Sequence, residues 1–163
     1  MRMTNGRRFV AAMLAVLMLI PANLALAGGA TVLRVHFSGS DARSSWSMDD
    51  LRALPAIVIE TTTPFTDGRQ RFAGVALHTV LGEVDADAVL SLRALNDYVV
   101  TIPVAEITEQ VPIIAYERNG ARMSVRDKGP LWVIYPFDDD PDYQNELSYS
   151  RSIWQLVEII VAR

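Results

Sequence analysis

Alternation of apolar and polar residues with a period of two is the most frequent pattern in this chain. Such alternation is typical of strands that bury one face, and short apolar runs rich in β-branched residues are typical of strands buried on both. One or the other pattern predicts strands at residues 31–37, 56–62, 89–95, 98–103, 113–118, 121–125, 131–135 and 153–162. We therefore expect a domain built mainly from β-structure.

Helical signals are few and short. Ser47 followed three residues later by Asp50 resembles a capping box, which predicts a helix over residues 48–53. Residues 74–81 give about two helical turns, and Gly82 is the expected C-cap. The helices are thus expected to be minor elements scattered among the strands.

The connections carry clear turn chemistry. Asn119–Gly120 is the strongest hairpin signal in the chain, and Asn96–Asp97 joins two further predicted strands. Residues 104–109 predict a short helical or irregular turn, whereas residues 63–71 and 136–150 predict loops. Loops as long as the last one are usually functional or disordered. Together these elements indicate an α+β, mostly β fold in a single domain.

The first residues have the features of an export signal. Three arginines and no acid accompany an apolar run, Phe9–Ile20, and a small-x-small cleavage pattern follows at Ala25–Ala27. A membrane-spanning helix needs roughly 20 apolar residues, and this run is shorter. We therefore expect residues 1–27 to be a cleavable signal peptide and residues 28–163 to form a periplasmic domain without membrane insertion.

Composition narrows the classes of function. The chain has 15 Lys and Arg against 19 Asp and Glu, and three of the arginines fall in the expected signal peptide. The exported domain is therefore acidic, which disfavours nucleic acid and anionic lipid as partners. The chain has no cysteine, which excludes disulfides, a thiolate nucleophile and a metal held by cysteine. No catalytic serine-histidine-acid set or phosphate-binding glycine loop is recognisable, so we predict no catalytic residue.

Residues that bind metals elsewhere are isolated or ambiguous here. His36 in a predicted strand and His78 in a predicted helix have no acid nearby at ligand spacing, so we expect no metal site from them. The acidic stretch Asp138–Asp142 allows three interpretations: a solvated acidic face, a calcium site or a docking surface. Its charge density favours contact with a partner rather than with a ligand.

Several segments in order resemble a known family. They are Phe72-x-Gly74-x-x-Leu77, Leu95-Asn96-Asp97-Tyr98, Ile114-Ala115-Tyr116-x-x-Asn119-Gly120, Gly129-Pro130-Leu131 and Ile153-Trp154-Gln155-Leu156. In that order and spacing they resemble the molybdopterin-binding domain of the sulfite oxidase family, over nearly all of residues 50–162. The resemblance implies a mixed α+β fold whose loops embrace a pterin cofactor.

One departure from that family changes the expected chemistry. Catalytic members carry a molybdenum-binding cysteine in the loop after the strand that corresponds to residues 56–62, where this chain has Thr61-Thr62-Thr63-Pro64. A threonine hydroxyl is not ionised near neutral pH and is a poor ligand beside a dithiolene. The chain more closely resembles the short periplasmic proteins of this fold that lack the cysteine. That subgroup implies binding of a reduced pterin, without molybdenum, and signalling to a membrane-bound enzyme of cyclic-di-GMP metabolism.

The resemblance and the loop positions together predict the ligand-binding residues. A pterin is flat, so its site needs aromatic faces for stacking and hydrogen-bonding groups for the ring edge. The aromatic candidates are Phe65, Tyr98, Tyr135, Phe137 and Trp154, and the polar candidates are Thr61, Thr62, Thr63, Asn96, Asp97, Arg151 and Ser152. Core packing is the alternative role for Trp154, and a simple turn is the alternative for Asn96–Asp97.

The sequence therefore predicts a non-enzymatic periplasmic protein that binds a pterin and relays its occupancy to the periplasmic domain of a membrane-bound cyclic-di-GMP enzyme or sensor. Two alternatives remain open. One is a molybdopterin-dependent oxidoreductase with a degenerate site that lacks the metal-ligand cysteine. The other is an interaction module without a ligand.

Overall fold

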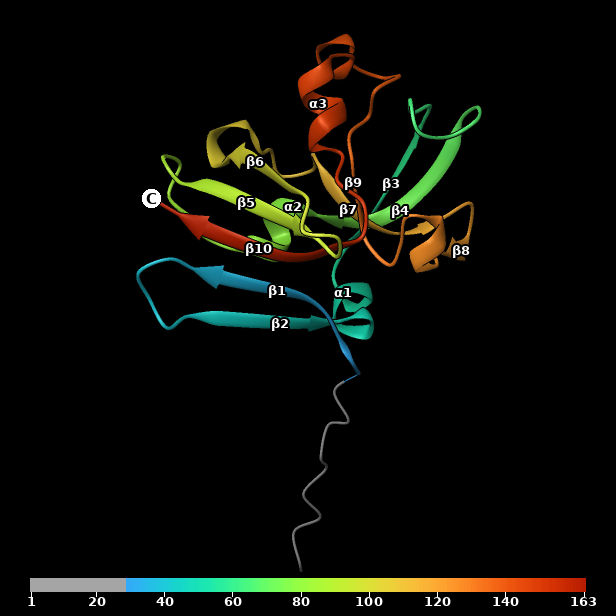
Figure 1. Cartoon of the computed structure of the whole chain (residues 1–163). Coiled ribbons are helices and arrows are strands. Elements are labelled where there is room, and N and C mark those ends of the chain that lie inside the picture. The colour runs from blue at the N-terminus through green and yellow to red at the C-terminus, as the bar shows by residue number, and fades with distance from the viewer. Residues whose placement is uncertain (1–28) are drawn as a thin grey trace, which may run out of the picture.

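The computed structural model describes residues 29–163, and it is mostly β-structure in two sheets with a few short helices (Figure 1). The predicted signal peptide, residues 1–27, lies outside the described residues. Within residues 29–163, no helix is long and apolar enough to span a membrane. The α+β, mostly β, single-domain class predicted from the sequence is confirmed.

The first sheet joins the two ends of the described chain. Its strands lie in the order β2-β1-β10-β5-β6. Their bounds are Thr31–Phe37 for β1, Arg43–Ser47 for β2, Val89–Ala94 for β5, Val99–Pro103 for β6 and Leu156–Ala162 for β10. The blue β1 and the red β10 run parallel side by side, and the other neighbours in this sheet pair antiparallel (Figure 1).

The second sheet is antiparallel throughout. Strands β3, β4, β7 and β8 follow one another in it. Strand β9 pairs with the first residues of β7, Ile113–Ala115, whereas β8 pairs with its last two. Their bounds are Ala56–Thr61 for β3, Gln70–Ala76 for β4, Ile113–Arg118 for β7, Ala121–Arg122 for β8 and Trp132–Ile134 for β9. At Gly74 a Cβ atom would lie 2.3 Å from the Ile114 carbonyl oxygen, so the close approach of β4 to β7 requires glycine there.

Helices are short and lie at the ends of strands. The α-helices are α1 (Met48–Ala53), α2 (Leu77–Leu81) and α3 (Glu146–Arg151), and the 3₁₀ turns are η1 (Val104–Glu106), η2 (Val125–Asp127) and η3 (Pro141–Tyr143). The capping box of α1 is confirmed: Ser47 Oγ accepts from Asp50 N at 3.1 Å, and the Asp50 carboxylate accepts from Ser47 N at 2.8 Å.

Several predicted elements differ from the structure. The strand predicted over residues 121–125 is a strand only at Ala121–Arg122, the loop predicted over residues 63–71 ends where β4 begins at Gln70, and the last predicted strand begins at Leu156. Residues 136–150 are not one long loop, because η3 and most of α3 form there, with Asp140 and Asn145 as side-chain N-caps. Residues 74–76 continue β4 instead of starting a helix, because they pair with β7. Strand β2 went unpredicted, since its polar sequence RSSWS lacks apolar alternation and is held in place by pairing with β1.

The inner strands of the second sheet, β4, β7 and β9, are buried on both faces. Alternate residues of β7 point to opposite faces: Ile114 and Tyr116 join the main core between the sheets, whereas Ile113 and Ala115 join a second cluster. The second cluster is centred on Trp132, which is fully buried, and Phe65 and Trp154 pack against it. This cluster matters for function because two predicted ligand residues cover it.

Candidate functional site

A cleft of about 270 Å³ opens where three segments meet. Phe65 comes from the β3–β4 loop, Asn96 and Tyr98 come from the β5–β6 turn, and the segment from α3 to β10 completes the lining with Tyr149, Ser150, Ser152, Ile153 and Trp154. Ala94, at the end of β5, lies at its base with them. The walls are mainly apolar and aromatic, with polar groups concentrated on the β5–β6 turn and around α3.

The aromatic side of the cleft is held by a buried tryptophan. Trp132 donates from Nε1 to the Ser152 carbonyl oxygen at 3.0 Å, which fixes its ring in the second cluster. Trp154 lies edge-on to Trp132, with ring centroids 6.2 Å apart, and Phe65 lies edge-on to Trp154 at 5.2 Å. Lys128 Nζ lies 5.7 Å from the ring centroids of both tryptophans. Phe65 and Trp154 therefore form a supported wall rather than two free side chains.

A second hollow, of about 300 Å³, lies on the other side of the same loop. It is lined by Thr62, Thr63, Pro64, Phe137, Asp138, Gln144 and Tyr149. Tyr149 lines both hollows, and its ring centroid lies 5.1 Å from that of Phe137. The β3–β4 loop thus separates two adjoining depressions that share one tyrosine.

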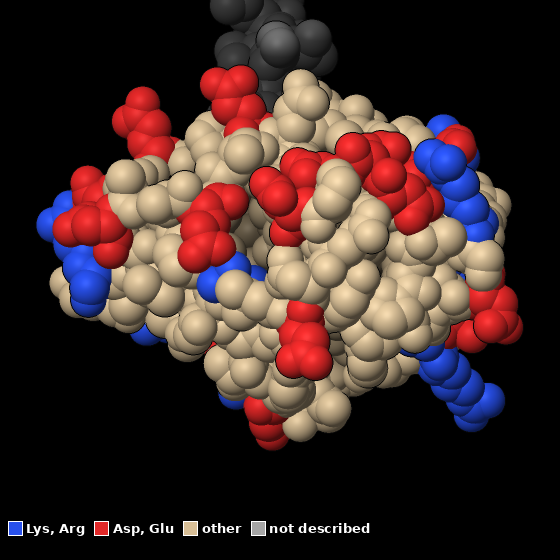
Figure 2. All heavy atoms as spheres, turned by 90° about the horizontal axis from the view of Figure 1, so that it is seen from above, with Lys and Arg blue, Asp and Glu red and all other residues tan. Residues whose placement is uncertain are grey.

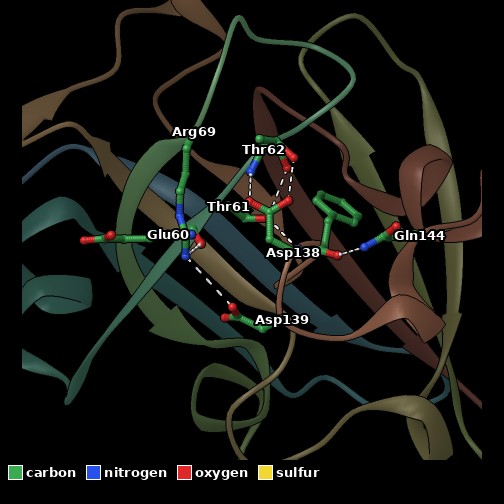
Figure 3. Close-up of polar contacts among 8 residues, drawn as sticks. Glu60, Thr61, Thr62, Arg69, Asp138, Asp139 and Gln144 are labelled. Carbon is green, nitrogen blue, oxygen red and sulfur yellow. Dashed lines mark hydrogen bonds and ion pairs between the residues drawn. The ribbon is translucent and has the colours of Figure 1, made fainter.

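The threonines of the β3–β4 loop are engaged by the acidic stretch. Thr62 donates from its backbone N and from Oγ1 to the two carboxylate oxygens of Asp138, at 2.8 and 2.5 Å (Figure 3). Asp138 N donates back to Oγ1 of the buried Thr61 at 3.0 Å. The hydrogen bonds from the Thr62 side chain and backbone lower the pKa of Asp138 below its usual value.

Neighbouring contacts brace the same region. Gln144 Nε2 donates to the Phe137 carbonyl oxygen at 2.6 Å, and Arg69 donates to the Glu60 carbonyl oxygen at 2.9 Å (Figure 3). Arg69 also lies 4.0 Å from the Asp139 carboxylate. Both of these side chains are more than half exposed, so this ion pair adds little stability.

Some predicted ligand residues lie outside both hollows. Arg151 donates from Nε to the Thr101 carbonyl oxygen at 3.0 Å and from Nη1 to Glu106. Tyr135 is buried, and burial raises the pKa of its hydroxyl. Asp97 has a left-handed backbone conformation in the β5–β6 turn and faces Arg93 at 3.5 Å.

The structure therefore divides the predicted residues into three groups. Phe65, Asn96, Tyr98, Ser152 and Trp154 come together at the first cleft, and Thr62, Thr63 and Phe137 come together at the second hollow. Thr61, Asp97, Tyr135 and Arg151 line neither. Tyr149 and Asp138 also line the hollows, and the lining is completed by residues not predicted as ligand contacts: Pro64, Ala94, Gln144, Ser150 and Ile153. Tyr149 and Gln144 belong to residues 136–150, whose polar and acidic sequence has no apolar periodicity to predict a helix.

Acidic side chains gather on the face that carries α3. Figure 2 looks down on the α3 end of the molecule, where acidic side chains predominate around a depression. The segment that leads into α3 contains Asp138, Asp139, Asp140 and Asp142, and α3 itself begins with Glu146. A cationic partner would be drawn to such a face.

The donor set of this region does not suit molybdenum. The chain has no cysteine to supply a thiolate, and the Thr61 and Thr62 hydroxyls are engaged in hydrogen bonds within the protein. Among residues 29–163, no group of three or more His, Asp or Glu side chains has the arrangement of a metal site.

No family model and no curated protein matches this chain. Among solved structures, the fold is similar to the sulfane dehydrogenase SoxCD from Paracoccus pantotrophus, with a TM-score of 0.57 and 11% sequence identity. The match covers 80% of this chain and 37% of the SoxCD chain, so this chain spans little more than a third of that protein. At this level of identity the similarity shows a distant relationship of fold.

Proposed function

We propose that this protein is a non-enzymatic periplasmic binding protein whose cleft holds the ring of a reduced pterin. The observation that carries the proposal is the aromatic lining of the cleft, with Phe65, Tyr98, Tyr149 and Trp154 around about 270 Å³. Small-molecule sites usually occupy roughly 300–1,000 Å³, so this cleft suits one flat bicyclic ring rather than a long cofactor. Stacking on aromatic faces would hold that ring.

Hydrogen-bonding groups for the ring edge lie on the β5–β6 turn. Asn96 Oδ1 accepts weakly from Tyr98 N at 3.3 Å, and within residues 29–163 neither the Asn96 amide nitrogen nor the Tyr98 hydroxyl donates to another group. Both side chains are exposed at the cleft. An amide and a phenol offer a donor and acceptor to the edge of a pterin.

The proposal is tested by titrating tetrahydrobiopterin into the purified domain by anaerobic calorimetry. Phe65→Leu should weaken binding about threefold to tenfold, because edge and stacking contacts of an aromatic ring contribute about 0.5–1.5 kcal/mol. Phe37→Leu is the matched control, since Phe37 lies on β1 and lines neither hollow. Absence of binding by the parent protein, or equal weakening by both variants, would rule out a pterin in this cleft.

A molybdopterin-dependent oxidoreductase is the second candidate, favoured by the fold similarity to a sulfane dehydrogenase. The two candidates differ in metal content. We expect protein expressed with an intact molybdenum-cofactor pathway to contain no stoichiometric molybdenum, because the chain offers no thiolate ligand. Elemental analysis of the purified protein decides between them, and one molybdenum per chain would establish the oxidoreductase.

We propose further that occupancy is relayed to the periplasmic domain of a membrane-bound cyclic-di-GMP enzyme or sensor. The support is the acidic face beside the hollows, which suits a basic docking partner (Figure 2). Asp139 and Asp142 are the residues to replace by asparagine, because Asp138 holds Thr62 and Asp140 caps η3. The double variant should associate more slowly with that domain at low salt and keep its pterin affinity. An interaction module without a ligand would show the first effect and no pterin binding.

A further inference from the structure

The joint between Thr62 and Asp138 connects two segments far apart in sequence. The Asp138 carboxylate accepts hydrogen bonds from the backbone N and the hydroxyl of Thr62, and Asp138 N donates to the Thr61 hydroxyl (Figure 3). We call these three hydrogen bonds the joint. Three hydrogen bonds therefore tie the end of β3 to the first residue of the acidic stretch. Hydrogen bonds to a charged acceptor are stronger than those between neutral groups, so the joint is specific to a carboxylate.

The loop beyond Thr62 behaves as one unit that carries Phe65. Thr63 Oγ1 accepts from Phe65 N at 3.1 Å and lies 2.8 Å from Thr66 Oγ1. Thr66 N donates to the Thr63 carbonyl oxygen at 3.4 Å. Because these bonds fix the loop internally, a displacement at Thr62 would move the Phe65 ring, whose centroid lies 5.2 Å from that of Trp154.

The other partner of the joint belongs to the opposite wall. Asp138 directly follows Phe137, whose ring packs against Tyr149 on α3. The Phe137 carbonyl oxygen accepts from Gln144 at 2.6 Å, which braces the acidic stretch against its own next turn. The Asp138 carboxylate therefore joins the wall that carries Phe65 to the wall that carries Tyr149.

We propose that Asp138 is a positioning residue for the cleft: through Thr62 it holds the loop that places Phe65 against Trp154. The acidic stretch and the ligand wall are thereby mechanically linked. A partner that binds residues 138–142 and a ligand that contacts Phe65 both act on these hydrogen bonds. Binding of the partner therefore changes the protein's affinity for the ligand, and binding of the ligand changes its affinity for the partner by the same factor. The identity of the ligand rests on the function proposed above, whereas the positioning role does not.

The first experiment needs no ligand. In a Trp46→Phe background, acrylamide quenching reports mainly on Trp154, because Trp132 is fully buried. Asp138→Ala should increase the quenching, since Phe65 no longer shields the indole. Asp139→Ala is the matched control: it removes the same charge one residue along without touching Thr62, and its quenching should equal that of the parent.

A second pair of variants separates positioning from a general loss of stability. Thr62→Ser keeps the hydroxyl donor, so acrylamide should quench its Trp154 fluorescence as in the parent. Thr62→Val removes the hydroxyl, so its Trp154 fluorescence should be quenched more strongly. This pair decides the question even if Asp138→Ala does not fold. Parent-like quenching of Thr62→Val, or of a folded Asp138→Ala, would overturn the positioning role.

The third measurement connects the joint to binding. Asp138→Ala should weaken tetrahydrobiopterin binding about threefold to tenfold, as expected when a wall of the site loses one or two hydrogen bonds that position it. Asp139→Ala should bind like the parent. If the parent itself does not bind this pterin while the quenching results hold, the positioning role stands and the proposed ligand is wrong. Unchanged affinity in Asp138→Ala beside normal parental binding would contradict the positioning role.

Discussion

Arg151 ends α3 with a side chain that is 11% exposed, and its guanidinium donates to the Thr101 carbonyl oxygen and to Glu106. These contacts attach α3 to β6 and to η1. In the sequence, the same arginine after a polar stretch was a reasonable candidate for the ring edge of a ligand. A guanidinium has five donors in a fixed plane, so its acceptors decide its role, and here they belong to the protein.

We predict that Arg151→Ala lowers the free energy of unfolding by about 1–2 kcal/mol, because a largely buried charged hydrogen-bond network is lost. The half-exposed Glu106 can regain water, which keeps the loss from being larger. Urea denaturation measures the change, with the exposed Arg122→Ala as the control. Tetrahydrobiopterin affinity should change by less than about twofold. A large loss of affinity with unaltered stability would instead place Arg151 at the ligand.

At the scale of elements, caps decide where the short helices begin. Helix α1 has only six residues, too few for intrinsic propensity to stabilise it, so its end contacts matter more. Ser47 is buried at the end of β2 and supplies one half of the capping box, while Asp50 supplies the other. The side-chain and backbone hydrogen bonds from Ser47 lower the pKa of Asp50.

Replacing Ser47 by alanine is therefore expected to cost about 1 kcal/mol of unfolding free energy, within the usual range of roughly 0.5–2 kcal/mol for such caps. Ser45→Ala is the control, since Ser45 is exposed in the same strand and caps no helix. Urea midpoints of the two variants measured together give the difference. Equal midpoints would show that packing of Leu51 in the core, and not the cap, holds this helix.

At the scale of the whole molecule, the protein buries both faces of the inner strands of its second sheet and connects the ends of the described chain through β1 and β10. The aromatic cleft lies where the loop after β3 reaches the segment that leads into β10. Loops at strand ends carry the candidate site, while the sheets fix the distances between those loops. The acidic stretch is bound into this arrangement by Asp138.

Lowering the pH should reduce the free energy of unfolding of this protein. The pKa values of Asp50 and Asp138 are both lowered in the folded protein, so each carboxylate stabilises the fold above its unfolded pKa of about 3.9. That stabilisation is lost as the pH falls through the lower folded pKa values. Thermal midpoints measured from about pH 5 to about pH 2 should fall less steeply in Asp138→Asn than in the parent. A parent-like slope in Asp138→Asn, or the same flattening in Asp139→Asn, would show that the Thr62 contacts do not lower this pKa.

Local sequence is sufficient to predict a structural feature when that feature depends only on residues close together in the chain. The Ser47–Asp50 capping box, the Asn119–Gly120 hairpin and the α+β, mostly β class all follow from short-range geometry and from periodicity. The sequence does not predict β2 because pairing with β1 holds it, and it does not predict α3 because that helix begins at the polar cap Asn145, just after the acidic stretch. Neither contains the apolar repeat on which sequence analysis depends.

The amino-acid sequence alone establishes which side chains are available: aromatic residues in predicted loops, three consecutive threonines at Thr61–Thr63, and no thiol anywhere. Which of these side chains meet depends on the tertiary fold. It brought Phe65, Tyr98 and Trp154 to one cleft, and it gave Arg151 and Thr61 acceptors and donors within the protein. The reason is physical: hydrogen bonds and packing join residues 50 or more positions apart, and such pairs are fixed by how the sheets fold together.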